Sequence, residues 1–235
     1  MPLWFCRFSP DAAEGGTSKI MTHAPPPVSP GEPAPDFTLS TVDGEELVSL
    51  ANYRGSPLFL ALLLGLWCPF CRRQIAQLGT FEPKLKAVGV ESLGVVATQP
   101  DNARLYFRFR PTRLRLAADP DLSTHRAYGV PKPVPTPEFM HALETIRINP
   151  DGAFPVPLPI VEAAATVAEL DGYVKNETDR ADMQRQWPQL KAHYLIDRDG
   201  IVRWANIECA EGLAGLGKSP SVDEILAVAR ALPGG

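Results

Sequence analysis

The order of apolar and polar positions in the first half of the chain predicts a series of strands and helices. The unbroken apolar run over residues 58–64 is typical of a central strand covered on both faces. Helical spacing follows over 69–87, where Pro83 is expected to kink or interrupt the helix, and a second apolar strand is predicted over 90–97. Shorter strands are predicted at 36–39, 47–50 and 114–118, and shorter helices at 101–109 and 122–128. This order predicts a parallel or mixed sheet with helices on both faces.

Proline interrupts the pattern between residues 131 and about 190. Eight of the 25 prolines in the chain lie between Pro131 and Pro159. We interpret 131–190, which we call the inserted segment, as an insertion or lid that packs on the core rather than a separate domain. The elements predicted within it are a strand at 143–148, an apolar helix at 161–174 and a polar helix at 177–187.

Regular patterning returns near the end of the chain. A hairpin is predicted from strands at 193–197 and 201–207, with a turn at Asp199-Gly200. An amphipathic helix follows over 222–232, and Ser221 with Glu224 gives it the sequence of a capping box.

The first 32 residues differ from the rest. Eight prolines lie before residue 36 and favour an extended chain, so we expect a proline-rich tail over 1–32 and one domain over 33–235. Nothing before Met21 has a clear period, which makes Met21 an alternative start. The opening residues lack the basic start and the run of about 7–15 apolar residues of a secretory signal, so we expect a cytoplasmic location.

Composition and charge narrow the classes of function. A formal net charge of −4 gives no bulk electrostatic reason to expect nucleic acid or an anionic membrane as a partner. No apolar run reaches about 18 residues, so no membrane span is predicted. Four cysteines in 235 residues are too few for a disulfide-stapled secreted scaffold. A close pair among them therefore indicates redox or metal chemistry.

Such a pair follows the apolar run directly, in the sequence Cys68-Pro69-Phe70-Cys71. A spacing of three places both sulfurs on one helical turn, close enough for a disulfide after small local movement. Cys68 is expected at the helix N-terminus, where unpaired N–H groups and the macrodipole lower a thiol pKa from about 8.5 toward neutrality. Pro69 suits the first helical position, where its missing N–H costs nothing.

Residues that flank the pair are predicted to shape the site. Arg72 and Arg73 add positive charge, and Trp67 is expected to shield one side of the thiolate and offer a flat docking surface. The alternatives are half of a zinc site and a structural or inert pair of thiols. A zinc site needs four ligands, and the sequence holds no second CxxC and no HxxxH, so we expect neither metal nor cofactor.

Two other features carry weaker signals. Arginines recur over 104–115 among Tyr106, Phe107 and Phe109, a pattern that a nucleic-acid surface would share. The helical spacing and the acidic total favour a solvated helix face over apolar core contacts. Cys209, after the predicted strand at 201–207, is either a strand-end thiol or a distant resolving thiol, and Cys6 falls in the tail.

From about Gly31 to Leu232 the chain resembles the peroxiredoxin-like branch of the thioredoxin fold, the alkyl hydroperoxide reductase and thiol-specific antioxidant group. The matching segments occur in the family's order at 31–37, 47–55, 67–72, 127–130, 194–200 and 221–232. The resemblance implies an α/β, thioredoxin-like fold with a central mixed sheet flanked by helices. It also implies an antioxidant oxidoreductase with a redox-active disulfide.

The chain departs from the family at the peroxide-binding positions. Neither the proline nor the threonine of the family's Pro-x-x-x-Thr-x-x-Cys is present, whichever of the two cysteines is aligned with the peroxidatic one. The family's arginine falls near Lys191, which keeps the charge but not the planar fork. Disulfide reductases of this fold carry a cis-proline near the same place, and Pro188 is close. Cys-Pro-Phe-Cys itself resembles the Cys-Pro-aromatic-Cys of glutaredoxins.

These features together predict a thiol-dependent oxidoreductase. In this hypothesis Cys68 attacks a peroxide or a disulfide, and Cys71 resolves the product as an intramolecular disulfide. The residues expected to shape the site are Trp67, Pro69, Arg72 and Lys191. The expected partners are a small peroxide or protein disulfide as oxidant and a thioredoxin- or glutathione-like thiol as reductant, and a second copy of the chain is a further candidate. The alternative is a non-catalytic redox sensor or scaffold that uses the same dithiol.

Overall fold

A computed structural model describes residues 25–44 and 46–232, so most of the predicted tail lies outside the described residues. Seven strands form one sheet in the order β2–β1–β5–β4–β3–β8–β9, and β6 pairs with β7 apart from it. The strands are β1 (Thr38–Thr41), β2 (Leu47–Ser49), β3 (Leu58–Leu63), β4 (Glu91–Val96), β5 (Arg115–Ala118), β6 (Arg147–Ile148), β7 (Leu158–Pro159), β8 (Ala192–Ile196) and β9 (Val202–Ile207).

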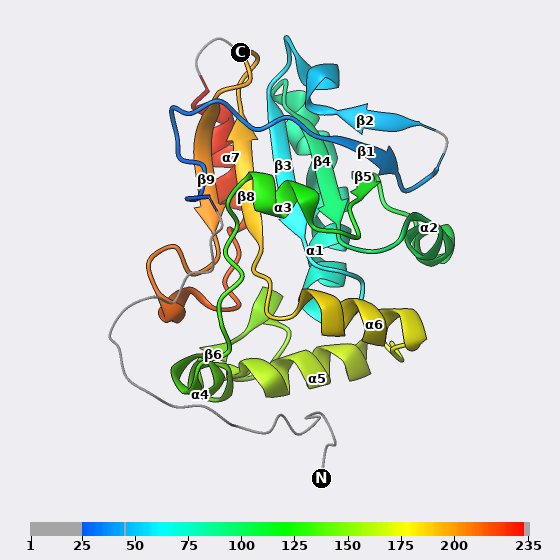
Figure 1. The fold of residues 1–235 in the computed structure, drawn as a ribbon, viewed down its shortest axis with the longest axis vertical. Coiled ribbons are helices and arrows are strands. Elements are labelled where there is room, and N and C mark those ends of the chain that lie inside the picture. The colour runs from blue at the N-terminus through cyan, green and yellow to red at the C-terminus, as the bar shows by residue number, and fades with distance from the viewer. Residues whose placement is uncertain (1–24, 45, 233–235) are drawn as a thin grey trace.

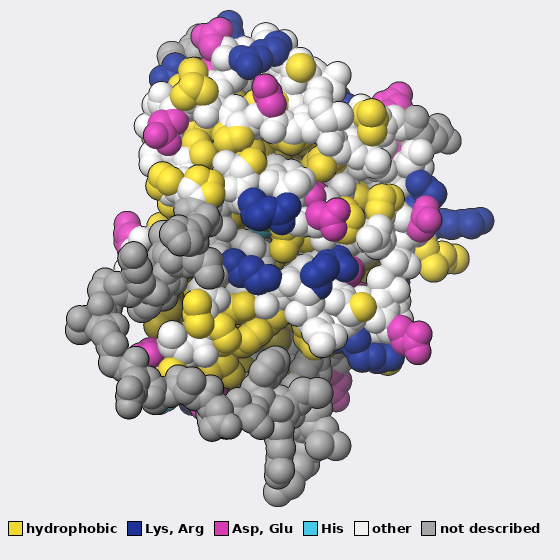
Figure 2. Space-filling model, in the orientation of Figure 1, with side chains coloured by type: hydrophobic (Ala, Val, Ile, Leu, Met, Phe, Trp, Pro, Cys, Tyr) yellow, Lys and Arg dark blue, Asp and Glu magenta, His cyan; other side chains and the backbone are white. Residues whose placement is uncertain are grey.

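Helices cover both faces of the sheet. They are α1 (Pro69–Ala87), α2 (Pro100–Phe109), α3 (Ser123–Ala127), α4 (Pro137–Thr145), α5 (Ile160–Leu170), α6 (Glu177–Gln186) and α7 (Val222–Arg230). In Figure 1, α3 lies in front of the sheet, α1 and α7 lie behind it, and α4, α5 and α6 gather at the lower end. Lys, Arg, Asp and Glu side chains are mixed over the face seen in Figure 2. Within the described part of the chain, no helix is long and apolar enough to cross a membrane.

The sheet is mixed, as the sequence predicts. Strands β3, β4 and β5 run parallel, whereas β8 runs antiparallel to β3 and β1 runs antiparallel to β5. Strand β3 is buried along its whole length because its even-numbered residues join one apolar cluster and its odd-numbered residues join the other. Each of its fully buried leucines stabilises the fold by about 1.5–3 kcal/mol. This packing fixes where β3 ends and therefore where the cysteine motif begins.

Two expectations about individual elements are wrong. Half of the strand predicted at 143–148 is helix, because Thr136 and Pro137 start α4, and only Arg147–Ile148 is strand. The Thr136 hydroxyl accepts a hydrogen bond from the Phe139 N–H at 3.2 Å, and a proline at the first helical position loses no bond. The alternating prolines therefore lead into a helix instead of excluding one.

Helix α1 is not interrupted at Pro83. It runs from Pro69 to Ala87 with Pro83 inside. An internal proline costs about 3 kcal/mol. Phe81 and Leu85, on either side of it, are both buried, and together they contribute about 3–6 kcal/mol. Core packing therefore outweighs the local preference.

The inserted segment lies against the end of the sheet at which the cysteine motif is found. Helix α5 packs on α1 and on α4, and its buried residues Ile160, Ala163 and Val167 join the apolar cluster that contains Leu58 and Tyr194. Helix α6 crosses the same end of the molecule (Figure 1). The segment thus supplies the surroundings of the site.

Candidate active site

Cys68 lies at the N-terminus of α1, directly after the turn that follows β3. Its N–H donates to the Gly65 carbonyl at 3.0 Å, and its backbone is extended, as a helix cap requires. Its sulfur accepts a hydrogen bond from the Cys71 N–H at 3.4 Å. Pro69 is the first helical residue. The sulfur of Cys68 therefore occupies the position of a capping acceptor, where the helix favours negative charge.

The two thiols have unlike environments. Cys68 is 5% exposed, Cys71 is fully buried, and both are reduced. A hydrogen bond from the Cys71 side chain lowers the pKa of Cys68 to about 7, against the opposing effect of burial and with further help from the charge of Lys191. Burial raises the pKa of Cys71, and its hydrogen bond to Cys68 adds to this. Cys68 is thus the thiolate near neutral pH, and Cys71 is the neutral hydrogen-bond donor.

Lys191 is a buried cation within electrostatic range of both cysteines. It is 4% exposed, and its ammonium group donates to the Ser219 hydroxyl at 2.9 Å. Burial alone would lower the pKa of Lys191, but the carboxylate of Glu208 and the nearby sulfurs raise it, so the lysine stays charged. Glu208 is held in turn by the backbone N–H groups of Lys191 at 3.1 Å and Gly217 at 2.7 Å.

Arg72 lies beside the motif but binds elsewhere. One guanidinium nitrogen donates to the Leu66 carbonyl at 2.7 Å, and the group stacks 3.8 Å above the ring of Tyr173. Its neighbour Arg73 donates twice to Asp171, at 2.9 and 3.1 Å. The two arginines therefore fasten the linker between α5 and α6 to the redox helix, while the charge of Lys191 acts on both sulfurs.

Trp67 is not an exposed docking surface, contrary to the sequence-based expectation. It is 9% exposed, and its indole N–H donates to the Gln186 side chain at 2.7 Å. The same Gln186 oxygen accepts the Gly65 N–H at 3.0 Å, and the Gln186 amide donates to the Ala97 carbonyl. One buried amide from α6 thus holds the turn before Cys68 in place.

The cis peptide bond expected near Lys191 lies between Trp187 and Pro188. It comes immediately after Gln186, so this segment is beside the turn that carries Trp67. The position is three residues earlier than the family resemblance indicates.

Sequence patterns did not single out Gln186, Tyr173 or Lys175. Tyr173 donates its hydroxyl to Asp179 at 2.8 Å, and the half-buried ammonium of Lys175 lies within electrostatic range of Cys68 and 3.7 Å from the Met183 sulfur. All three come from the inserted segment, more than 100 positions beyond the cysteines. No local spacing points to them, because only tertiary packing brings them to the motif.

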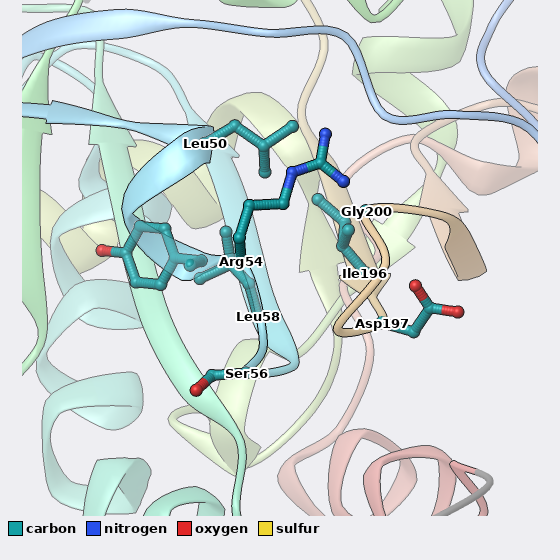
Figure 3. Close-up of a pocket in the computed structure, with 8 residues that line it drawn as sticks. Leu50, Arg54, Ser56, Leu58, Ile196, Asp197 and Gly200 are labelled. Atoms are coloured by element: carbon teal, nitrogen blue, oxygen red, sulfur yellow. The ribbon is translucent and has the colours of Figure 1, made fainter.

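The other sequence-based candidates have weaker links to this chemistry, and Cys209 lies within electrostatic range of Lys191. Burial raises the pKa of Cys209 to about 12, which makes it a poor nucleophile. In residues 25–44 and 46–232, no group of three or more His, Cys, Asp or Glu side chains is placed to hold a metal ion. A hollow at the start of β3, the opposite end from the cysteines, is filled by Arg54, whose guanidinium donates to the Asp199 carbonyl (Figure 3).

Comparison with known proteins gives a consistent result. The model of the AhpC/TSA family matches residues 30–205. The chain is 34% identical over 110 residues to the thiol-disulfide oxidoreductase ResA of Geobacillus thermodenitrificans, a match that covers 46% of this chain and 62% of that protein. It is 28% identical over 104 residues to the chloroplastic peroxiredoxin Q of Gentiana triflora, which covers 44% of this chain and 48% of that protein. These matches span less than two thirds of either relative.

A solved structure has the same fold. The reduced 2-Cys peroxiredoxin of Plasmodium vivax superposes with a TM-score of 0.55 at 21% identity, covering 87% of this chain and 82% of that one. The α/β architecture with a central mixed sheet flanked by helices is therefore the thioredoxin-like fold that the sequence predicts.

Proposed function

The chain belongs to the AhpC/TSA family, and on that basis we propose that it is a thiol–disulfide oxidoreductase whose working pair is Cys68 and Cys71. The observation that carries this proposal is the asymmetry of the two thiols. Cys68 has a pKa near 7 and caps a helix, whereas Cys71 is buried one turn away with a raised pKa. Such an arrangement suits one attacking and one resolving sulfur.

The reaction proceeds by two exchanges. The Cys68 thiolate attacks one sulfur of the substrate disulfide, the substrate S–S bond breaks, and the departing thiolate takes a proton. Cys71 then loses its proton and attacks the Cys68 sulfur of the mixed disulfide, which releases the second substrate thiol. The substrate gains two electrons and two protons, and Cys68 and Cys71 become a disulfide. A thioredoxin- or glutathione-like thiol reduces this disulfide in the same two steps.

Disulfide exchange suits the surroundings of Cys68 better than peroxide reduction. Its sulfur receives a hydrogen bond from the backbone of Cys71, and no threonine stands in the peroxide-ordering position. The guanidinium of Arg72 is engaged by Leu66 and Tyr173. In the proposed site Lys191 stabilises the thiolate, Pro69 starts the helix, Trp67 keeps the turn rigid and Arg72 holds the inserted segment.

We also propose a cytoplasmic location. Four cysteines in 235 residues are too few for a disulfide-stapled secreted scaffold, which suits a compartment that keeps thiols reduced. Alkylation of thiols in intact cells, followed by mass spectrometry, tests this. The pair should be alkylated in unstressed cells and should form a disulfide under oxidative stress.

The activity is tested with insulin as the disulfide substrate and glutathione as the reductant. Wild-type protein should reduce insulin over many turnovers, faster than it consumes hydrogen peroxide, and Cys68→Ser should have no activity above background. Equal rates for the two proteins would refute the proposal. A disulfide that forms once, without turnover, would instead identify a redox sensor.

A further inference from the structure

We propose that α2 and the linker between α5 and α6 form a docking surface for a protein whose redox-active cysteine is flanked by acidic and apolar residues. The inference rests on the proposed function and names the kind of partner that the site would exchange disulfides with. The docking surface is defined by residues 100–113 and 170–175. It is separate from the two cysteines but connected to them through stacked side chains.

The connection is a ladder of four stacked side chains. Arg72, one helical turn after Cys68, stacks on Tyr173 at 3.8 Å. Tyr173 meets Tyr106 of α2 edge to face, with ring centroids 5.8 Å apart. Arg110 then lies over Tyr106 at 4.9 Å. The ladder thus holds α2 beside the N-terminus of the redox helix, so a partner seated on α2 would reach Cys68.

Apolar side chains stand exposed on this surface. Leu105 is 58% exposed and Phe109 is 72% exposed, and their spacing of four places them on one outward face of α2. Val174 in the linker is 88% exposed and Leu170 at the end of α5 is 60% exposed. Exposed apolar residues that cluster beside a reactive group are typical of an interaction site. The α2 helix therefore does more than cover the core, which is what its sequence alone predicts.

The charge of the surface is opposite to that of the whole chain. Residues 100–113 hold four arginines and a single aspartate, a surplus of three positive charges, whereas the chain carries −4. Arg108 and Arg110 are exposed on either side of Phe109. In Figure 2, dark blue and yellow side chains project together at the edge of the molecule where Figure 1 places α2. Complementarity therefore calls for an acidic partner with apolar contacts.

The test compares three disulfide probes on the full-length reduced protein. Two are decapeptides with a central cysteine protected as its thiopyridyl disulfide, one flanked by Asp, Glu and Leu and the other by Lys and Leu. The third is 4,4′-dithiodipyridine, which is small and neutral. Cys68 attacks the peptide sulfur, thiopyridone leaves, and Cys71 displaces the peptide thiol. The acidic peptide should react about tenfold faster than the basic one at low salt, and the ratio should approach one at high salt.

Reversing the charge of two arginines on α2 tests whether the docking surface lies there. R108E/R110E should lower the acidic-to-basic ratio to one or below. The matched control K84E/K86E makes the same change of charge at the far end of α1, where both lysines are exposed, and should keep the wild-type ratio. F109S should slow both peptides alike. Equal reactivity of the two peptides in the wild-type protein, or equal effects of the two double variants, would overturn the proposal.

Two control experiments complete the test. The first distinguishes an acidic protein partner from a nucleic acid, and the second distinguishes failure of the docking proposal from failure of the proposed redox function. Salt-sensitive binding of a single-stranded oligonucleotide that is lost in R108E/R110E, without any preference for the acidic peptide, would assign the surface to nucleic acid and overturn the proposal. If Cys68→Ser reacts with 4,4′-dithiodipyridine as fast as wild type, the proposed function fails instead. The docking proposal is decided by the peptide ratio alone.

Discussion

Replacing Lys191 with methionine tests whether a buried cation sets the reactivity of Cys68. The pKa of Cys68 is lowered to about 7, about 1.5 units below the 8.5 of a free thiol, which corresponds to about 2 kcal/mol. The largest cause of this shift is the hydrogen bond from the Cys71 side chain; burial opposes it, and the positive charge of Lys191 adds to it. Without the lysine we expect the pKa to rise by about one to two units, to between about 8 and 9.

The rate at neutral pH should change less than the pKa does. At pH 7 the thiolate fraction falls from about one half to between about one tenth and one hundredth. A thiolate of higher pKa is also a stronger nucleophile, by about threefold per unit, so the rate at pH 7 falls only about two- to fivefold. The pH at which alkylation by iodoacetamide is half-maximal is therefore the better readout. It should move from about 7 to between about 8 and 9.

Two variants control for the buried carboxylate that Lys191 leaves behind. K191M/E208Q removes both charges, and its half-maximal pH should lie below that of K191M but above that of wild type, since Glu208 raises the pKa of Cys68. K218M removes an exposed lysine nearby and should behave like wild type. If the half-maximal pH stays near 7 in both Lys191 variants while their thermal unfolding remains cooperative, the electrostatic role of Lys191 is wrong.

Three further predictions concern stability. Gln186→Leu breaks the hydrogen bonds that hold Gly65 and Trp67 and should lower the free energy of unfolding by about 2–4 kcal/mol, measured in urea; a loss below about 0.5 kcal/mol would contradict this. The pKa of Cys68 is lower in the folded than in the unfolded state, so its ionisation stabilises the fold; this stabilisation is complete above the unfolded pKa and is lost as pH falls through 7. Between pH 6 and 8.5, the free energy of unfolding of reduced wild type should therefore rise by roughly 2 kcal/mol relative to that of Cys68→Ser. Parallel plots of unfolding free energy against pH for the two proteins would contradict this. The buried Tyr128 hydroxyl has no hydrogen-bond partner among the described residues, so Tyr128→Phe should leave Tm unchanged or raise it, and a fall of several degrees would be inconsistent with the packing described.

Local chemistry was sufficient to predict the centre of the site. The buried strand, the turn and Pro69 place Cys68 at a helix N-terminus, because these preferences act within a few residues of one another. The same reasoning places the ends of α1 correctly at Pro69 and Ala87 but overestimates the effect of Pro83. A single residue's preference is smaller than the core contacts around it.

Contacts between residues far apart in the sequence could not be predicted from local patterns. The side chains of Gln186 and Tyr173 reach the cysteine motif from an insertion in which helices are predicted at 161–174 and 177–187, but no local spacing shows where those helices pack. Trp67 has the residue type of a docking surface, but it is buried and donates a hydrogen bond to Gln186. Arg72 has the charge expected beside a thiolate, but Tyr173 and Leu66 engage it. In both cases the partner is set by the packing of the inserted segment.

The assignment of the attacking and resolving sulfurs is tested most directly by trapping. Each single variant, Cys71→Ser and Cys68→Ser, is mixed with a disulfide substrate at pH 7 and followed by intact mass. We expect Cys71→Ser to accumulate one stable mixed disulfide at Cys68 and Cys68→Ser to form almost none at Cys71. Adducts of equal yield on both variants, or an adduct only on Cys68→Ser, would contradict the account.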